Sequence, residues 1–249
     1  MDWGKAKTVL ILSFLMLNVL LGFQLWNDYK ETRSSPSFNG LTEDIQAIMQ
    51  QKQIRLGLDT KIPKETPSLQ ITVTFNQTVS TEQQVPLDPQ IETKAVFNRK
   101  QLEKALQGKA EHTEHYELDP VTSGGGVFVL QQMYGGYPLF EMKMKLYHEN
   151  QKITAFSQSY ADKPLGNGEP KQQVLSAYKA VGRVIENYLP NGSAIQDVRL
   201  GYHGQSFNSP VQVLAPYWRI AIEGGGIYYV HAISGAVEDP SQKEKQEWE

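Results

Sequence analysis

The chain has 249 residues, with 24 lysines and arginines, 27 aspartates and glutamates, and a formal net charge of −3. This near-balance argues against nucleic-acid binding, which normally requires a basic domain or stripe. The absence of cysteine excludes disulfides, thiolate metal sites, cysteine nucleophiles and a lipidated N-terminal cysteine. The length is enough for one large domain or two small ones with a hydrophobic core.

Residues 8–26 (TVLILSFLMLNVLLGFQLW) are almost all apolar and carry no charge. At about 1.5 Å per residue, a helix of this length nearly crosses a hydrocarbon core of about 30 Å. Trp3 and Trp26 bracket the segment at the interface depth that indoles prefer. The alternative is a cleaved signal peptide, but the apolar run exceeds the usual length and no small-residue cleavage site follows it. We therefore predict an uncleaved transmembrane anchor.

The charges that flank this span predict its orientation. Two lysines precede the span and two basic residues follow it, so the basic count alone does not decide. The amino terminus adds positive charge upstream, whereas Asp28 and Glu31 neutralise the downstream flank. We therefore expect a single-pass protein of the cell membrane, with a cytoplasmic N-terminus and the bulk of the chain outside the cytoplasm.

One polar residue lies within the apolar span. Asn18 falls near the predicted bilayer centre, where an amide prefers a hydrogen-bonding partner on another helix. Phe14 and Gly22 lie four residues to either side, on the same helical face, and glycine permits close approach of a second helix. Phe14, Asn18 and Gly22 are therefore our predicted contact residues for another transmembrane helix. The alternative is a polar residue tolerated in a plain anchor.

The rest of the chain predicts an α+β fold of antiparallel sheets packed with helices, because helices precede runs of strands instead of alternating with them. Period-two patterns predict strands at 68–76, 115–119, 125–133, 138–149, 152–160, 194–204, 217–223, 227–233 and 236–238. Residues spaced three and four apart predict helices at 41–54, 93–108 and 171–192. Residues 77–93 contain Pro86 and Pro89 and are predicted to be a loop. In the 138–149 strand, alternation predicts one wet and one dry face.

These elements and the turn-rich segments between them predict the domain organisation. The segment GNGEP at 166–170 is the best internal boundary. The predicted parts are a cytoplasmic tail (1–7), the transmembrane anchor (8–26), a juxtamembrane linker (27–40), a first α+β lobe (41–165), a second α+β lobe (166–239) and a polar tail (240–249).

Three consecutive glycines occur twice, in SGGGVFVL (123–130) and EGGGIYYV (223–230). Each run leads into an apolar strand, which leaves open whether the two lobes are a duplication or share only a common type of turn. Alternating residues on both sides of Gly224–Gly226 predict a β-hairpin. No helix follows these glycines to form an anion site.

Motifs for catalysis and metal binding are missing from the sequence. His112 and His115 in EHTEH fit neither HExxH nor HxxEH, and we interpret the segment as solvated and polar. His231 falls within an apolar strand and is interpreted as a hydrogen-bonded packing residue. Ser206 lacks the second glycine of a GxSxG motif, and no phosphate-binding glycine motif is present. We predict no catalytic, cofactor-binding or metal-binding residues, no cofactor, and no enzymatic activity.

The chain resembles the YycH/YycI family over nearly its full length, and three stretches carry the resemblance. They are MDWGKAKTVLILSFLMLNVLLGFQLW, YPLFEMKMKLYHENQKITAFSQSY and PYWRIAIEGGGIYYVHAISGAVE. The resemblance implies a membrane protein of Gram-positive bacteria with an extracytoplasmic α+β domain. It also implies association with YycH and with the sensor histidine kinase WalK (also called YycG), and an effect on signalling that controls cell-wall metabolism. The family supplies no catalytic residues.

Other partners and functions remain open at this point. The closing stretch is also similar to PepSY-type modules, so the alternative is a membrane-tethered module that binds or restrains an extracytoplasmic peptidase. A cell-wall hydrolase is a second rival. The expected partners are the kinase, YycH and the lipid bilayer, with a homodimer left open and no nucleic acid.

Overall fold

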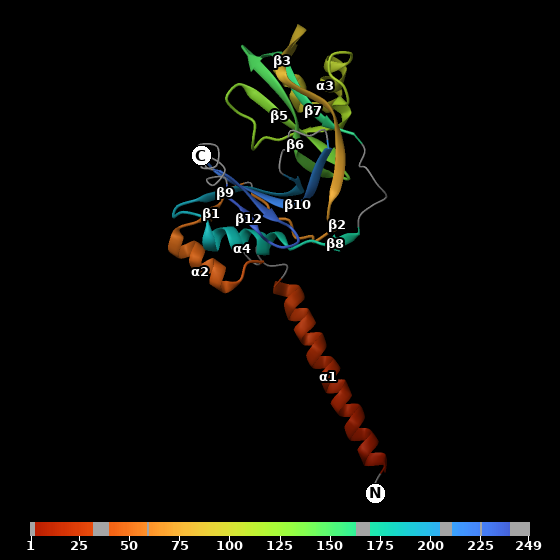
Figure 1. The fold of residues 1–249 in the computed structure, drawn as a ribbon. Helices are drawn as coiled ribbons and strands as arrows, with labels where there is room; N and C mark the ends of the chain where they lie inside the picture. The colour runs from red at the N-terminus through yellow and green to blue at the C-terminus, as the bar shows by residue number, and fades with distance from the viewer. Residues whose placement is uncertain are drawn as a thin grey trace. The chain divides into compact units, whose positions relative to one another are not determined.

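The computed structural model describes residues 3–31, 40–58, 60–162, 170–204, 211–224 and 226–239 (Figure 1). The chain divides into two compact units, Met1–Ala47 and Ile48–Glu249. Several predictions fall wholly or largely outside the described residues. These are most of the linker at 27–40, most of the boundary at 166–170, Ser206 and the polar tail at 240–249.

Helix α1 (Trp3–Glu31) belongs to the first unit and contains the whole of segment 8–26. The prediction of one continuous helix across this segment is therefore confirmed. Within the residues that the structure describes, no helix is both long enough and apolar enough to cross a membrane. The transmembrane anchor thus stays a prediction.

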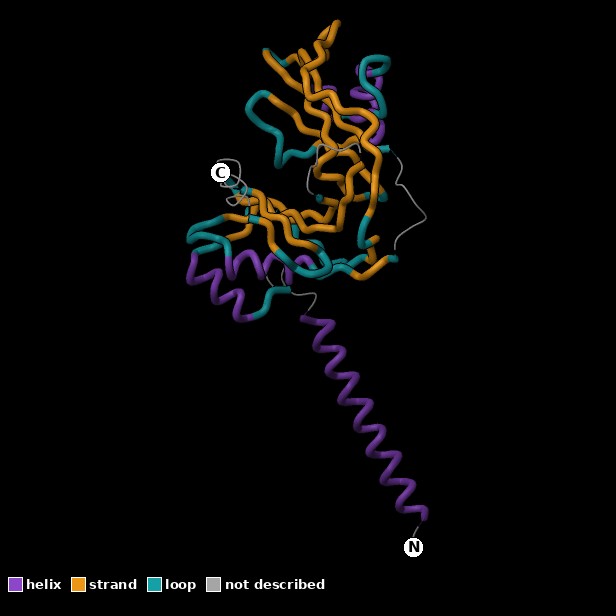
Figure 2. Tube along the Cα trace, in the orientation of Figure 1, coloured by secondary structure: helices purple, strands orange, loops and turns teal. Residues whose placement is uncertain are grey.

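Strands make up most of the second unit (Figure 2). The strands are β1 (Arg55–Leu56), β2 (Ser68–Gln70), β3 (Val73–Glu92), β4 (Tyr116–Leu118), β5 (Val127–Tyr134), β6 (Tyr137–Glu149), β7 (Lys152–Ala161), β8 (Lys171–Gln173), β9 (Ala194–His203), β10 (Val211–Ile222), β11 (Ile227–His231) and β12 (Val237–Glu238). The other helices are α2 (Glu43–Lys52), α3 (Arg99–Leu106) and α4 (Ala177–Asn187), with 3-10 helices η1 (Thr93–Phe97) and η2 (Thr113–His115).

Ten of the described strands form one sheet in the order β1-β9-β10-β3-β7-β6-β5-β4, and β11 and β12 continue from β10. All pairings within it are antiparallel except β1 with β9 and β6 with β9. The α+β class is confirmed, but the sheet is mixed where we expected purely antiparallel pairing. Strands from the two predicted lobes pair with each other, β10 with β3 and β9 with β1.

The loop predicted at 77–93 is wrong, because β3 continues through it to Glu92. Proline cannot donate to a strand ladder, which is why the segment looked like a loop. The pairing of β3 with β7 accommodates the prolines through irregular register. Shifts occur between Thr81 and Val85 and between Pro86 and Ile91, on either side of Pro86.

Two predicted helices begin later than expected. Asn98 adopts an extended backbone in the middle of the 93–108 helix, and its side chain accepts from the Gln101 backbone N–H. The segment is therefore a 3-10 turn followed by α3. In the 171–192 helix, the first three residues pair with β2 as strand β8, and Ser176 caps α4. Both helices start at a side-chain cap, as expected for Asn and Ser.

The core of the second unit includes two clusters of buried apolar side chains among the described residues. One lies between α3 and strands β5–β7 and includes Leu106, Met144 and Ile153. The other joins β3, β6, β9 and β10 and includes Leu139. The dry face predicted for the 138–149 strand is confirmed by the buried Phe140, Met142, Met144 and Leu146, whereas Leu139 on the other face is also fully buried. That face is covered at its β9 end, where Leu139 pairs with Tyr202.

Candidate functional site

The predicted contact stripe lies along one face of α1. Phe14, Asn18 and Gly22 are spaced by four residues within the helix and are all exposed. A Cβ atom added at Gly22 would meet nothing within 4 Å. The stripe is therefore an open surface in the chain as described. Its role in binding another helix stays a prediction.

Gly224 and Gly226 lie in a hairpin, as predicted for the glycine run. Strands β10 and β11 pair in antiparallel register from Tyr217 opposite His231 to Ala221 opposite Ile227. The Ile222 N–H donates to the Gly226 carbonyl at 3.2 Å, and Gly224 has a φ of +63°, a left-handed conformation that favours glycine. The glycines therefore serve the turn.

His231 has the packing role predicted for it. Its Nδ1 accepts from the backbone N–H groups of Ile233 and Ser234, at 3.3 and 3.2 Å, and so holds the turn that follows β11. Burial lowers the pKa of His231, and the charge of Glu238 opposes this shift. A low pKa favours the neutral imidazole, which leaves Nδ1 able to accept.

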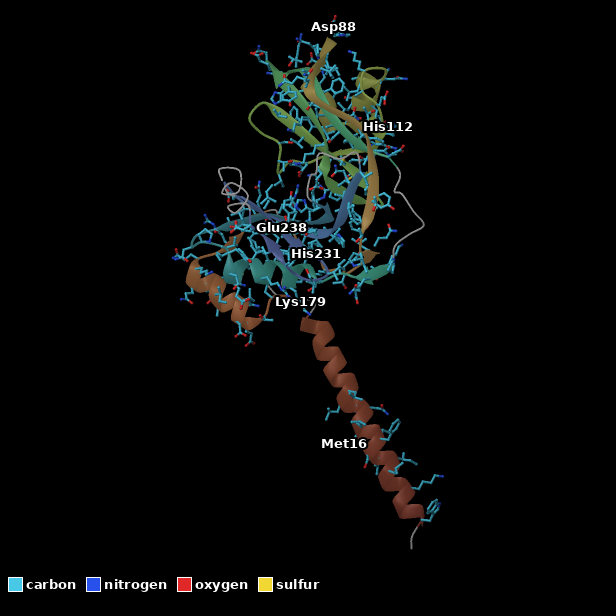
Figure 3. All side chains as sticks on the ribbon, viewed as in Figure 1. Met16, Asp88, His112, Lys179, His231 and Glu238 are labelled. Carbon is cyan, nitrogen blue, oxygen red and sulfur yellow. The ribbon has the colours of Figure 1, made fainter. Side chains whose placement is uncertain are left out.

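Three possible metal ligands of the EHTEH segment lie close together in the structure. Side-chain ligand atoms of His112, Glu114 and His115 lie within 4.8 Å of one another, and all three residues are exposed. The His112 ring stacks on Tyr160 with centroids 4.0 Å apart. Figure 3 shows His112 well apart from His231 and Glu238. Exposure agrees with the solvated segment we predicted, and three exposed donors alone do not establish a metal site.

His203, at the end of β9, is buried between two carboxylates. Its Nδ1 contacts Glu141 Oε1, and its Nε2 lies 3.3 Å from Glu238 Oε2. The ring stacks on Tyr229 with centroids 3.9 Å apart. The Tyr217 hydroxyl donates to Glu238 Oε1 at 2.8 Å, and burial together with this carboxylate raises the pKa of Tyr217. The cluster therefore connects five strands: β6, β9, β10, β11 and β12.

A second buried network is centred on Arg219 in β10. Arg219 and Asp119, which follows β4, are both fully buried. Arg219 Nη1 donates to Asp119 Oδ2 at 2.5 Å, and Nη2 donates to Asp119 Oδ1 at 3.0 Å and to Asp197 Oδ2 at 2.9 Å. Asp119 also accepts from Thr122 Oγ1 at 2.7 Å and from Gln131 Nε2 at 2.8 Å. The bidentate geometry is the strong form of an arginine–carboxylate pair.

Both partners of this pair are charged. Burial would raise the pKa of Asp119, but the hydrogen bonds and charge of Arg219 outweigh it and hold the pKa below its usual value. Burial would likewise lower the pKa of Arg219, but Asp119 and Asp197 raise it. A buried ion pair of this kind costs stability when either partner is lost.

Both networks were missed by sequence reasoning. Asp119 and Arg219 are 100 positions apart, and nothing in their local patterns relates them. A weak signal was present in β10, where Arg219 lies among apolar residues that are otherwise buried. A charged residue in such a strand indicates a buried partner elsewhere in the chain.

The fold and these networks define an α+β domain with a mixed ten-stranded sheet, preceded by one long helix. The family model described as YycI protein matches residues 76–233, more than half of the chain, and the chain belongs to the YycI family. The resemblance found in the sequence is confirmed. Membership of this family fits a regulator of the YycG/WalK pathway.

Other comparisons add little. Comparison with curated proteins gives no significant match. Among solved structures, the chain is similar to an uncharacterized protein from Eubacterium rectale ATCC 33656, with 10% identity and a TM-score of 0.34. The match covers 49% of this chain and 44% of that one, so this chain spans less than half of its length. A likeness this weak carries no argument about fold or function.

Proposed function

We propose that this chain is a non-enzymatic regulator that binds the sensor histidine kinase YycG/WalK and its companion YycH. Through this binding it adjusts two-component signalling that controls cell-wall metabolism. The observation that carries the proposal is the match to the YycI family over residues 76–233.

The proposal includes attachment to the cell membrane through segment 8–26, with the second unit outside the cytoplasm. It rests on the sequence, in which this segment is uncharged and almost wholly apolar and has a positive upstream flank. The stripe of Phe14, Asn18 and Gly22 then faces a helix of the kinase or of YycH. Interfaces between membrane helices are enriched in small residues and in amides that hydrogen-bond across them.

Regulation requires that the partner distinguish two states of the kinase. A bound protein shifts such an equilibrium only by the difference between its affinities for the two states. We therefore expect the complex to bind one signalling state of the kinase more tightly than the other. The second unit supplies surface for the partner ectodomains, and α1 supplies the contact between helices.

The test is capture of partners by the full-length chain from native membranes after crosslinking. Asn18→Leu and Gly22→Leu should each reduce recovery of the kinase or YycH by roughly threefold to twentyfold, the range for one interhelical contact. Met16→Leu is the matched control, because Met16 lies nearly opposite Asn18 around the helix and is exposed (Figure 3).

Each outcome decides a part of the proposal. Because a Cβ atom at Gly22 meets nothing within 4 Å, loss of capture in Gly22→Leu reports the partner contact. Unchanged capture in both stripe variants would reject the helix contact. Capture of an extracytoplasmic peptidase in place of the kinase and YycH would reject the regulator in favour of a peptidase-binding module.

A further inference from the structure

A cavity of about 810 Å³ lies in the second unit, beside β1 and the first half of β9. Its wall is completed by the residues that follow β1, by the turn after β4 and by the end of β10. The volume falls within the range of about 300–1,000 Å³ that is usual for small-molecule sites. Leu56, Leu58, Pro120 and Val121 give the wall an apolar part.

The charged part of the wall follows from strand alternation in β9 and β10. Trp218 faces the helix side of the sheet, where its indole donates to the Leu175 carbonyl just before α4. Its neighbour Arg219 therefore faces the other side, where it is paired in register with Arg199. The face that packs on α4 is apolar, and the opposite face carries the charges of the cavity.

The two arginines pair with different carboxylates. Like charges directly opposite each other on paired strands are unfavourable unless anions lie between them. Arg219 takes both oxygens of Asp119 and one of Asp197. Among the described residues, Arg199 pairs with Glu117 alone, at 3.4 Å, and that carboxylate is about half exposed.

Two further donors line the same cavity. Arg55 of β1 is exposed and makes no hydrogen bond or ion pair through its side chain with any residue that the structure describes. Arg219 Nε is buried and has no hydrogen-bond partner among the described residues. A buried donor without a partner is costly. Among the described residues of the wall, Arg55, Arg199 and Arg219 balance Asp119, Asp197 and Glu223 in formal charge, and Arg55 is the arginine whose guanidinium has no partner.

We propose that this cavity binds the carboxylate of a small organic acid or of a short peptide, with Arg199 as the main anchor and Arg55 as the second. Guanidinium groups match carboxylates through paired hydrogen bonds. Glu223, at the end of β10, is the exposed acidic residue of the wall. It favours a ligand with one carboxylate over a dianion. The proposal goes beyond the regulatory function and does not depend on it.

Isothermal titration of the full-length chain in detergent micelles tests the site. The probes are butyrate, acetyl-trialanine with a free C-terminal carboxylate, its C-terminal amide, and acetyl-Ala-Glu-Ala-amide. The carboxylate probes should bind and the carboxylate-free amide should not. The carboxylate probe that binds most tightly shows whether the natural ligand is a small acid, a peptide terminus or an acidic side chain. Absence of saturable binding by all carboxylate probes would overturn the proposal.

Variants place the binding in this cavity. Arg199→Gln should lower the affinity for the tightest-binding probe at least about tenfold, which is the effect of losing a charge-assisted pair. Arg55→Gln should lower this affinity by a smaller factor, and Glu223→Gln should raise it. Arg99→Gln is the matched control, because Arg99 is exposed on α3 and pairs only within that region. Equal affinities in Arg199→Gln and Arg99→Gln would overturn the site.

A second variant keeps the test decisive if Arg199→Gln does not fold. Val121→Trp adds bulk to the cavity wall and changes no charge. It should abolish probe binding while the melting temperature of the chain stays close to that of the wild type. Retention of wild-type affinity by folded Val121→Trp would show that the probe binds elsewhere.

Discussion

Arg219 and Asp119 form a fully buried bidentate ion pair across 100 positions of sequence, with Nη–Oδ distances of 2.5 and 3.0 Å. The pair joins β10 to the turn that follows β4. The Arg219 guanidinium also lies 5.2 Å from the centroid of the Phe140 ring. One arginine therefore holds together three segments of the second unit that are remote in sequence.

Removal of the acidic partner should be strongly destabilising. Asp119→Ala leaves Arg219 buried with only Asp197 to compensate its charge, and we expect a loss of about 3–5 kcal/mol in the free energy of unfolding. Urea denaturation of the full-length chain measures it. Glu103→Ala is the control, because Glu103 pairs with Arg99 on the exposed face of α3 and should cost at most about 1 kcal/mol. Similar losses in the two variants would contradict the buried pair.

The same pair predicts how stability depends on pH. The pKa of Asp119 is lower in the folded chain than its ordinary value of 3.8. Its contribution is therefore complete above that ordinary value and is lost as pH falls through the lowered one. Below about pH 5, as pH falls through 3.8 and the lowered value, the free energy of unfolding should fall less steeply in Asp119→Asn than in the wild type. Parallel pH profiles of the two proteins in urea denaturation would disprove this linkage.

His203 should be needed to keep Glu141 compatible with burial. His203→Leu leaves that carboxylate without its imidazole partner, and one of its oxygens already lacks a partner among the described residues. We expect a loss of about 3 kcal/mol, the cost of breaking a buried pair. Glu141→Gln placed in the same chain should restore part of it. A double-mutant cycle on unfolding free energies measures the coupling, and additive losses would argue against it.

Gly201 in β9 should tolerate no side chain. A Cβ atom there would lie 2.6 Å from both the Pro138 carbonyl oxygen and the Phe140 ring. Gly201→Ala should therefore cost about 1–3 kcal/mol through overpacking. Gly124→Ala is the control, since a Cβ atom at Gly124 meets nothing within 4 Å. Thermal unfolding of both variants tests the contact, and equal melting temperatures would count against it.

Local sequence was enough to predict the elements that depend on local physics. The meander β4–β7 and the β10–β11 hairpin follow from side-chain periodicity and from glycine turns. The continuous helix α1 follows from the uncharged apolar run at 8–26. The predicted start of the helix at 171–192 and the predicted loop at 77–93 were wrong, because strands elsewhere in the chain determine the conformation of both segments. Pairing with β2 holds Lys171–Gln173 extended, and pairing with β7 carries β3 past Pro86.

The sequence by itself determined the α+β class, the apolar segment 8–26, the stripe of Phe14, Asn18 and Gly22 and the YycI family. The tertiary structure decided which buried charges meet. Arg219 meets Asp119, and His203 meets Glu141 and Glu238. It also decided that Arg55 and Arg199 line one cavity. The reason is physical: periodicity reports which face of an element is buried, whereas an ion pair requires two elements to be placed against each other.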